Sequence, residues 1–420
     1  MKIKLSDFLD YLIIYWMIAY VFIINWFALI TQASLIMIFL VFLRLCQNLK
    51  KTLRLSSFYF GLIFSLIYPV FNYINLGGNQ NILTENVITI ITTTSLFIYV
   101  SFICKYKRQF IINFFRKQKY LFNIIMLINI PFLILQLGGN TELSGIHPKT
   151  LTNTFSSDLV SGLFGYNGTG FLTMYFCFLI VYNFALYKQG NIKQKKLFII
   201  YNLSLIGFES FVAANSDNKA LFVLAPLFLI TYIVIFHIDL YKNFLRKAKL
   251  LVDYVIKGIF AIVLFFFVSQ PFIGTIDQLK EMLASLNYGM SHANLAYGGA
   301  ERIGTIVYAL NNSSIRWTGA GIAKHTWQES YCLGFAHFGI NDFGSFLCLG
   351  GLLFLILLIC FMLSVYRNIF SDCITRYTFF TLTIVVLIYT QLLTALSITC
   401  SWTFFVFTVA MLHNKKIEGK

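Results

Sequence analysis

Long apolar stretches recur along the whole chain, and they are the feature that most constrains its fold. An α-helix rises about 1.5 Å per residue, so about 20 apolar residues cross the hydrocarbon core of a bilayer. Twelve runs of roughly this length occur, near residues 8–24, 27–45, 56–76, 86–104, 120–137, 170–187, 197–214, 220–237, 254–272, 343–366, 377–393 and 396–412. The runs predict an all-α polytopic membrane protein with about 12 transmembrane helices.

Composition agrees with this prediction. Only 11% of the residues are charged, whereas soluble domains carry about 25%. A soluble globular enzyme and a disordered chain are therefore excluded. Two apolar stretches, 8–45 and 377–412, are too long for one crossing, so each is expected to form a helical hairpin with a break near Asn25 or Ser397.

The positions of the basic residues favour twelve spans with both termini in the cytoplasm. In that topology 26 of the 32 Lys and Arg residues fall in cytoplasmic segments, where positive charge is normally retained. The six on the outer side are Lys149, Lys219, Lys280, Arg302, Arg316 and Lys324. The net charge of +16 is thus assigned to loops beside anionic headgroups, and nucleic-acid binding is rejected.

Residues 1–420 are predicted to form a single integral membrane domain with two enlarged outer loops. The first loop covers 138–169 and the second, larger one covers 273–342. The cytoplasmic connections are short and basic. Because long loops in compact proteins usually carry function, we expect the chemistry on the outer face.

The second outer loop holds residue types that bind phosphate and move protons. Arg302 and Arg316 offer guanidinium groups, which can hold a phosphate through two parallel hydrogen bonds. His325 and His337 titrate near neutral pH and can take a proton from a hydroxyl. Asp342 lies at the start of the tenth span. The alternative is that the arginines bind lipid headgroups or pair with nearby acidic residues.

A second group lies around the short outer turn between the seventh and eighth spans. Lys219 opens the eighth span, where its ammonium group can reach headgroup depth. Glu209 lies about two helical turns before Ser216 and inside the membrane, where an ionisable residue is a functional candidate. The alternative roles are a lysine that only reaches for the interface and a glutamate paired with a neighbouring helix.

No metal or nucleotide cofactor is expected. Gly319 and Gly321 lack the preceding strand and the third glycine of a dinucleotide site. No cluster of His, Cys and Asp has the spacing of metal ligands. The eight cysteines lie mostly inside apolar runs and are interpreted as small core residues.

These features together resemble the bacterial O-antigen polymerases (Wzy-type), in the wider O-antigen ligase and polymerase family. The similarity covers the topology of the whole chain and three short motifs. The first is Ser216-Asp-Asn-Lys219-Ala-Leu221 at the start of a span. The second is Arg302 upstream of Gly319-Ala-Gly321, and the third is His337 before a glycine-rich span start.

The resemblance implies a metal-independent glycosyltransferase of the bacterial inner membrane, with both termini cytoplasmic and both enlarged loops periplasmic. It would polymerise undecaprenyl diphosphate-linked repeat units into O-antigen or a related surface polysaccharide. The implied partners are the lipid-linked donor and acceptor glycans, membrane lipid, and a chain-length regulator protein as a candidate. No cofactor is implied, because the donor carries its own diphosphate leaving group.

The resemblance also assigns roles to residues. His337 would activate the acceptor hydroxyl and Arg302 would hold the donor diphosphate, both as catalytic residues. Lys219 stands where the family commonly has Arg, and Phe338 follows His337 where many members have Asn. The remaining candidates for substrate binding are Arg316, His325, Asp342 and Glu209.

Two other functions stay open at this point. A flippase for lipid-linked glycans would also have twelve spans and a cationic cavity, but its loops would be short on both faces. An O-antigen ligase would share the same residue chemistry, so the sequence separates it poorly from a polymerase.

Overall fold

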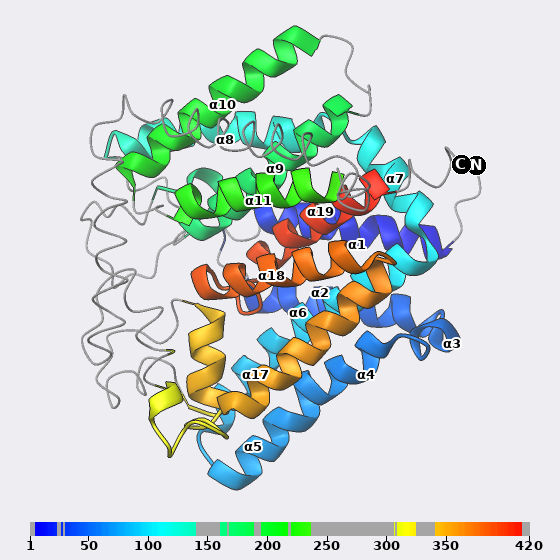
Figure 1. Cartoon of the computed structure of the whole chain (residues 1–420), viewed down its shortest axis with the longest axis vertical. Helices are drawn as coiled ribbons and strands as arrows, with labels where there is room; N and C mark the ends of the chain where they lie inside the picture. The colour runs from blue at the N-terminus through cyan, green and yellow to red at the C-terminus, as the bar shows by residue number, and fades with distance from the viewer. Residues whose placement is uncertain are drawn as a thin grey trace, which may run out of the picture. The chain divides into compact units, whose positions relative to one another are not determined.

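The structure is a computed structural model that describes residues 5–22, 27, 30–139, 160–165, 168–188, 195–216, 220–236, 306, 309–324 and 341–413. Within these residues every regular element is a helix and no β-strand occurs (Figure 1). Six described helices are long and apolar enough to cross a membrane, or seven if one bent pair counts as a single span, and four shorter apolar helices accompany them. The all-α class is therefore confirmed. The count of twelve spans stays a prediction, because the predicted span 254–272 lies outside the described residues.

The chain divides into two compact units. The first unit comprises Met1–Lys107, Lys280–Ser371 and Thr383–Thr403. The second comprises Arg108–Leu279, Asp372–Leu382 and Phe404–Lys420.

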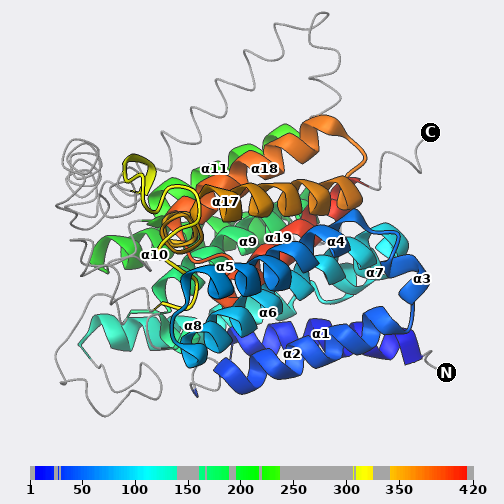
Figure 2. The ribbon, with the colours of Figure 1, turned by 90° about the horizontal axis from the view of Figure 1, so that it is seen from below.

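The first unit is built from helices of the N-terminal quarter and one long helix near the C-terminus. Its helices are α1 (Leu5–Phe22), α2 (Ile30–Cys46), α3 (Leu49–Thr52), α4 (Ser56–Leu62), the π-helix η2 (Ile63–Ile67), α5 (Tyr68–Leu76), α6 (Gln80–Tyr106) and α17 (Asp342–Ile369). Figure 2 shows α1 and α2 side by side, as predicted for the hairpin over residues 8–45.

A buried ion pair fixes α1 against α2 and α6. Nε of Arg44 lies 2.6 Å from Oδ1 of Asp10, and neither side chain is exposed. Lys107 adds a second cation, with Nζ 2.8 Å from Oδ2 of Asp10 and in contact with Asp7. The hydroxyl of Tyr99 donates to Oδ1 of Asp10 at 3.3 Å. Because an unpaired buried charge is strongly destabilising, this network sets how the three helices align.

Aromatic rings fill the space between α4–η2–α5 and α17. The ring of Phe64 stacks on Phe354 at 4.6 Å and on Phe361 at 5.9 Å between centroids. A Cβ on Gly61 would lie 2.9 Å from the side chain of Ile98 and 3.1 Å from that of Phe361. Because Gly61 has no side chain, α4 can approach α6 and α17 closely.

The second unit contains α7 (Arg108–Lys117), α8 (Leu121–Leu137), the short 3₁₀ helix η5 (Gly162–Phe164), α9 (Thr169–Lys188), α10 (Lys195–Asn215) and α11 (Ala220–Phe236). The axes of α7 and α8 bend by 48° at their junction. The helix α7 was not predicted; its ten residues begin and end with basic residues, and its apolar run is too short to cross a membrane.

Helices α18 (Cys373–Tyr389) and α19 (Leu396–His413) contribute residues to both units. They confirm that the stretch 377–412 forms two helices. The connection is at residues 390–395, earlier than the break predicted at Ser397, which lies inside α19. Both α18 and α19 begin close to the predicted spans.

Candidate functional site

The tenth predicted span, α17, is a broken helix. Gly351 lies inside it with φ 70° and ψ −174°, so residues 342–350 and 352–369 form two helical parts. In Figure 1 the yellow segment 309–324 lies at the corner where these two parts meet. A Cβ on Gly351 would lie 2.3 Å from the backbone carbonyl carbon of Trp317. Only glycine meets both demands, a left-handed φ and this close approach of another backbone.

The loop segment 309–324 provides hydrogen-bond donors for the last carbonyls in the first part of α17. The last carbonyls of a helix have no partner within it. Here the backbone N–H of Ala320 donates to the carbonyl of Cys348 at 2.8 Å, and that of Gly321 donates to the carbonyl of Leu349 at 3.0 Å. The carbonyl of Gly350 accepts a hydrogen bond from the hydroxyl of Tyr68.

The same segment provides hydrogen-bond acceptors for the first N–H groups in the second part of α17. The first N–H groups of a helix also lack partners within it. The N–H of Leu352 donates to the carbonyl of Arg316 at 2.8 Å, and the N–H of Leu353 donates to the carbonyl of Trp317 at 3.2 Å. Residues 316–321 therefore bridge the break through four backbone hydrogen bonds.

The Gly319-Ala-Gly321 motif is explained by this contact. Gly319 has φ 75°, and a Cβ there would lie 2.2 Å from the carbonyl oxygen of Leu349. Gly321 also has a positive φ of 122°. Gly319 thus lets the segment lie against the backbone of α17, a role more specific than the loop turn considered from sequence, and Gly321 supplies the positive φ that follows.

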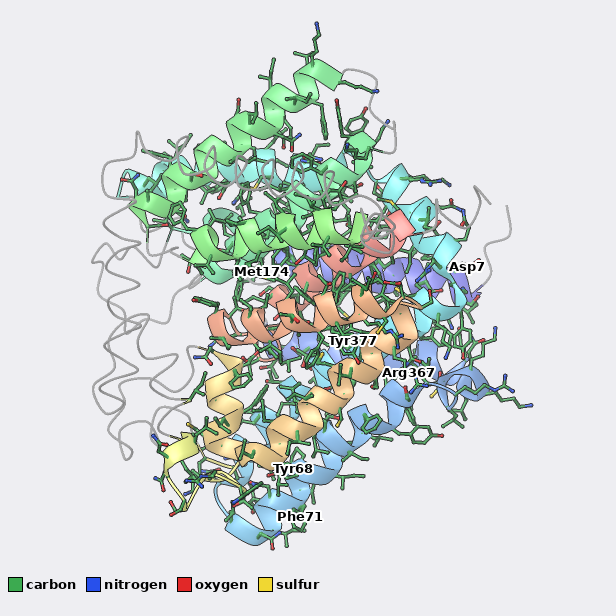
Figure 3. All side chains as sticks on the ribbon, viewed as in Figure 1. Asp7, Tyr68, Phe71, Met174, Arg367 and Tyr377 are labelled. Carbon is green, nitrogen blue, oxygen red and sulfur yellow. The ribbon has the colours of Figure 1, made fainter. Side chains whose placement is uncertain are left out.

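Asn72 holds the segment from the side of α5. Its Nδ2 donates to the carbonyl of Thr318 at 2.7 Å, and its Oδ1 accepts from the N–H of Ile322 at 2.8 Å. One buried amide therefore contacts the chain on both sides of the two glycines. Figure 3 labels Tyr68, one helical turn earlier, where α5 lies beside α17.

The next part of the segment is held by α6 and the residue before it. Nδ2 of Asn86 donates to the carbonyl of Ile322 at 2.8 Å. The N–H of Asn79 donates to the carbonyl of Ala323 at 3.0 Å. With Asn72, these contacts fix residues 318–323 against α5 and α6 as well as against α17.

Two of the predicted outer cations stand at the two ends of this fixed segment. Arg316 is half-buried, and its Nε donates to the carbonyl of Leu310 at 2.5 Å while Nη2 donates to that of Asn311 at 3.4 Å. These bonds use two of the five N–H donors of a guanidinium. Lys324 is also half-buried and follows the segment, with its N–H donating to the carbonyl of Gly321 at 3.3 Å.

Asp342 lies at the start of α17 and is fully buried. Its carboxylate accepts hydrogen bonds from the N–H of Leu393 and from Oγ1 of Thr394, the latter at 2.6 Å. Its own N–H donates to the carbonyl of Thr390 at 3.1 Å. Asp342 thus joins α17 to the connection between α18 and α19, and a role in substrate binding stays a prediction.

Glu209 belongs to α10 in the second unit, whereas Arg316 and Asp342 belong to the first. It is 1% exposed, and neither carboxylate oxygen has a hydrogen-bond partner in the described part of the chain. The other predicted site residues, Lys219, Arg302, His325 and His337, lie outside the described residues, so their roles stay predictions.

The sequence reasoning missed Tyr68, Asn72 and Asn86, which were counted only as parts of apolar spans. A signal was present, because Tyr68 and Asn72 are four residues apart and so lie on one face of a helix. Polar groups on one face of a span need a partner inside the protein.

Among the residues that the structure describes, no group of three or more His, Cys, Asp and Glu side chains could hold a metal ion. Comparisons with protein-family models, curated proteins and solved structures found no match to this chain. The site is therefore interpreted from its own geometry and from the sequence motifs.

Proposed function

We propose that this protein is a glycosyltransferase that polymerises undecaprenyl diphosphate-linked repeat units into O-antigen or a related surface polysaccharide at the periplasmic face of the bacterial inner membrane. The observation that carries the proposal is the segment 316–321, which bonds to both parts of a broken helix and holds the cation of Arg316 beside the break.

The chemistry calls for fixed positive charge. The acceptor hydroxyl oxygen forms a bond to the anomeric carbon of the donor sugar, and the bond from that carbon to the diphosphate oxygen breaks. The electron pair leaves with the lipid diphosphate, and His337 takes the hydroxyl proton. Cations stabilise the charge that grows on the diphosphate most effectively when they do not have to move during the reaction.

Arg316 meets this demand through its backbone. Its carbonyl accepts from Leu352 and its guanidinium bonds to two further carbonyls. In the proposal Arg316 binds the diphosphate with Arg302 and Lys219. Both lipid tails stay in the bilayer, so the donor and the acceptor meet at one interface. Their relative orientations are restricted there, which favours the reaction.

The decisive experiment uses the purified protein in liposomes with lipid-linked repeat units and a metal chelator. We expect products with two or more repeat units, and their absence from folded protein would refute the polymerase. Arg302→Ala and His337→Ala should abolish chain growth without preventing insertion into the membrane. Lys219→Arg should retain chain growth.

Arg316→Ala should weaken diphosphate binding and slow chain growth. The control is Arg367→Ala, which removes an exposed arginine from the last turn of α17, away from the break that the segment of Arg316 bridges (Figure 3). Equal activity of the two variants would remove Arg316 from the site.

Deletion of the gene separates the related functions. A polymerase predicts surface glycan of a single repeat unit. Loss of all surface glycan with lipid-linked units trapped inside would indicate a flippase instead. Undiminished long polymer that stays on its lipid carrier would indicate a ligase.

A further inference from the structure

Helix α10 buries one stripe of residues, and that stripe includes a carboxyl group. The stripe consists of Leu205, Glu209, Val212, Ala213 and Ser216, all 4% exposed or less. Their spacing of four, three, one and three residues places them on one face of the helix. Glu209 is therefore turned toward the interior of the second unit.

The neighbour of this stripe is α9, which runs antiparallel to α10. Nδ2 of Asn183 in α9 donates to Oδ1 of Asn202 in α10 at 2.8 Å, and Asn183 also bonds with Asn123 in α8 at 2.9 Å. The polar group at position 202 is thus satisfied by amides, whereas Glu209 lies about two turns further along α10.

Three described carboxyl groups are almost fully buried, and they differ in their partners. Asp10 pairs with Arg44 and Lys107, and Asp342 accepts two hydrogen bonds, as described above. Glu209 has no hydrogen-bond partner in the described residues. An isolated ionised carboxylate in an apolar interior costs far more than a neutral acid, so such a group takes up a proton.

Two serine hydroxyl groups, one in α10 and one directly after it, are also buried without a described hydrogen-bond partner. Oγ of Ser210 and Oγ of Ser216 are buried and have no partner among the described residues. Ser216 lies seven residues beyond Glu209, about 10 Å along the helix axis, and directly follows the C-terminal end of α10. A buried polar group without a partner calls for an explanation, and a bound water molecule or ion is one, so the two hydroxyls indicate where a proton could be passed between Glu209 and the end of the helix.

We propose that Glu209 is a proton-binding site inside the membrane-embedded part of the second unit, reached from the end of α10 at Ser216. The ligand is a proton, and the group reacts as a neutral carboxylic acid. The proposal is independent of the glycosyltransferase activity, because it concerns the state of one side chain in the folded protein.

The test is modification by dicyclohexylcarbodiimide, a membrane-permeant reagent that attacks protonated carboxyl groups. The full-length protein in liposomes is treated at pH 7, digested, and analysed by mass spectrometry. Glu209 should carry more label than Asp10, because the reagent needs a protonated carboxyl group and Asp10 is paired with the cations of Arg44 and Lys107. The Glu209→Gln variant should lose this label.

Several results would overturn the proposal. Equal labelling of Glu209 and Asp10 would mean that the reagent reports access alone. Protection of Glu209 by raised sodium chloride at constant pH would mean that the site binds sodium. Absence of label from folded protein would refute exchange through Ser216.

Infrared spectroscopy tests the protonated state without any reagent. The carbonyl band of protonated carboxylic acids should be weaker in Glu209→Gln than in the wild-type protein at pH 7. The matched control Asp10→Asn should leave that band unchanged, because Asp10 is paired with cations. A band of equal intensity in the wild type and in Glu209→Gln would refute a neutral Glu209.

Discussion

Asn72 offers the sharpest perturbation of the broken helix, because one side chain holds both sides of the glycine turn. Asn72→Leu keeps the number and branching of the side-chain heavy atoms but removes the bonds to the carbonyl of Thr318 and the N–H of Ile322. Ile322 is buried, so its N–H would be left without water. Thr318 is half-exposed, so its carbonyl can turn to solvent in part.

The expected magnitude follows from these two exposures. A buried donor left unsatisfied costs about 1–3 kcal/mol, and a lost bond with partial access to water costs about 0.5–1.5 kcal/mol. Together these losses should let the segment 316–323 open more easily by about 1.5–4.5 kcal/mol. When exchange of backbone amides proceeds through local opening, that change raises the exchange rate about 13- to 2,000-fold.

Hydrogen–deuterium exchange followed by mass spectrometry measures this directly on a peptide covering 315–323. Asn75→Leu is the matched control, because Asn75 is exposed on the same helix and its Nδ2 bonds only to the carbonyl of Phe71 among its described contacts. Exchange in Asn72→Leu that stays within about three-fold of the wild type would refute the inferred clamp. So would equal exchange in the two variants.

Two further contrasts test the fold. Gly351→Ala should raise exchange in the same peptide and lower the unfolding temperature, because its Cβ would lie 2.3 Å from backbone atoms. The control Gly207→Ala has nothing within 4 Å of its Cβ and should stabilise α10 by about 0.5–1 kcal/mol in denaturant titration. Equal effects of the two variants would contradict the close approach at Gly351. Asp10→Asn should cost about 3–5 kcal/mol of unfolding free energy because it leaves the buried guanidinium of Arg44 without its carboxylate, whereas Glu209→Gln should change it by less than about 1 kcal/mol. Asp7→Asn, at 38% exposure, should also stay below about 1 kcal/mol, and a tolerated Asp10→Asn would refute the role of the ion pair.

Helix positions were predictable because the bilayer sets a length and apolar runs of that length are easily recognised. The predicted spans 56–76, 170–187 and 220–237 match described helices to within a residue or two. Helix α7 was not predictable in this way, because burial of its apolar face depends on other helices of the second unit. Its Phe115 ring, for example, packs on Phe122 at 5.4 Å between centroids.

The candidate site was predictable only in part. Arg316 and the two glycines attracted attention because outer cations and Gly-x-Gly turns are rare in this chain. Their attachment to α17 could not be predicted, because it joins backbone groups about 30 residues apart and leaves no pattern of side chains. Asp342 shows the same limit, since its hydrogen-bond partners lie 51 and 52 residues further along the chain.

The break in α17 links this predicted span to Arg316, one of the predicted outer cations, through a physical requirement. Inside a membrane protein each backbone N–H and carbonyl freed from a helix must find another partner. Residues 316–321 supply four such partners, so the loop completes the span and does not merely connect two spans. A substitution that straightened α17 would release this segment and with it Arg316. The position of the cation and the break in the helix must therefore be lost together, which makes the exchange of the 315–323 peptide a measure of both.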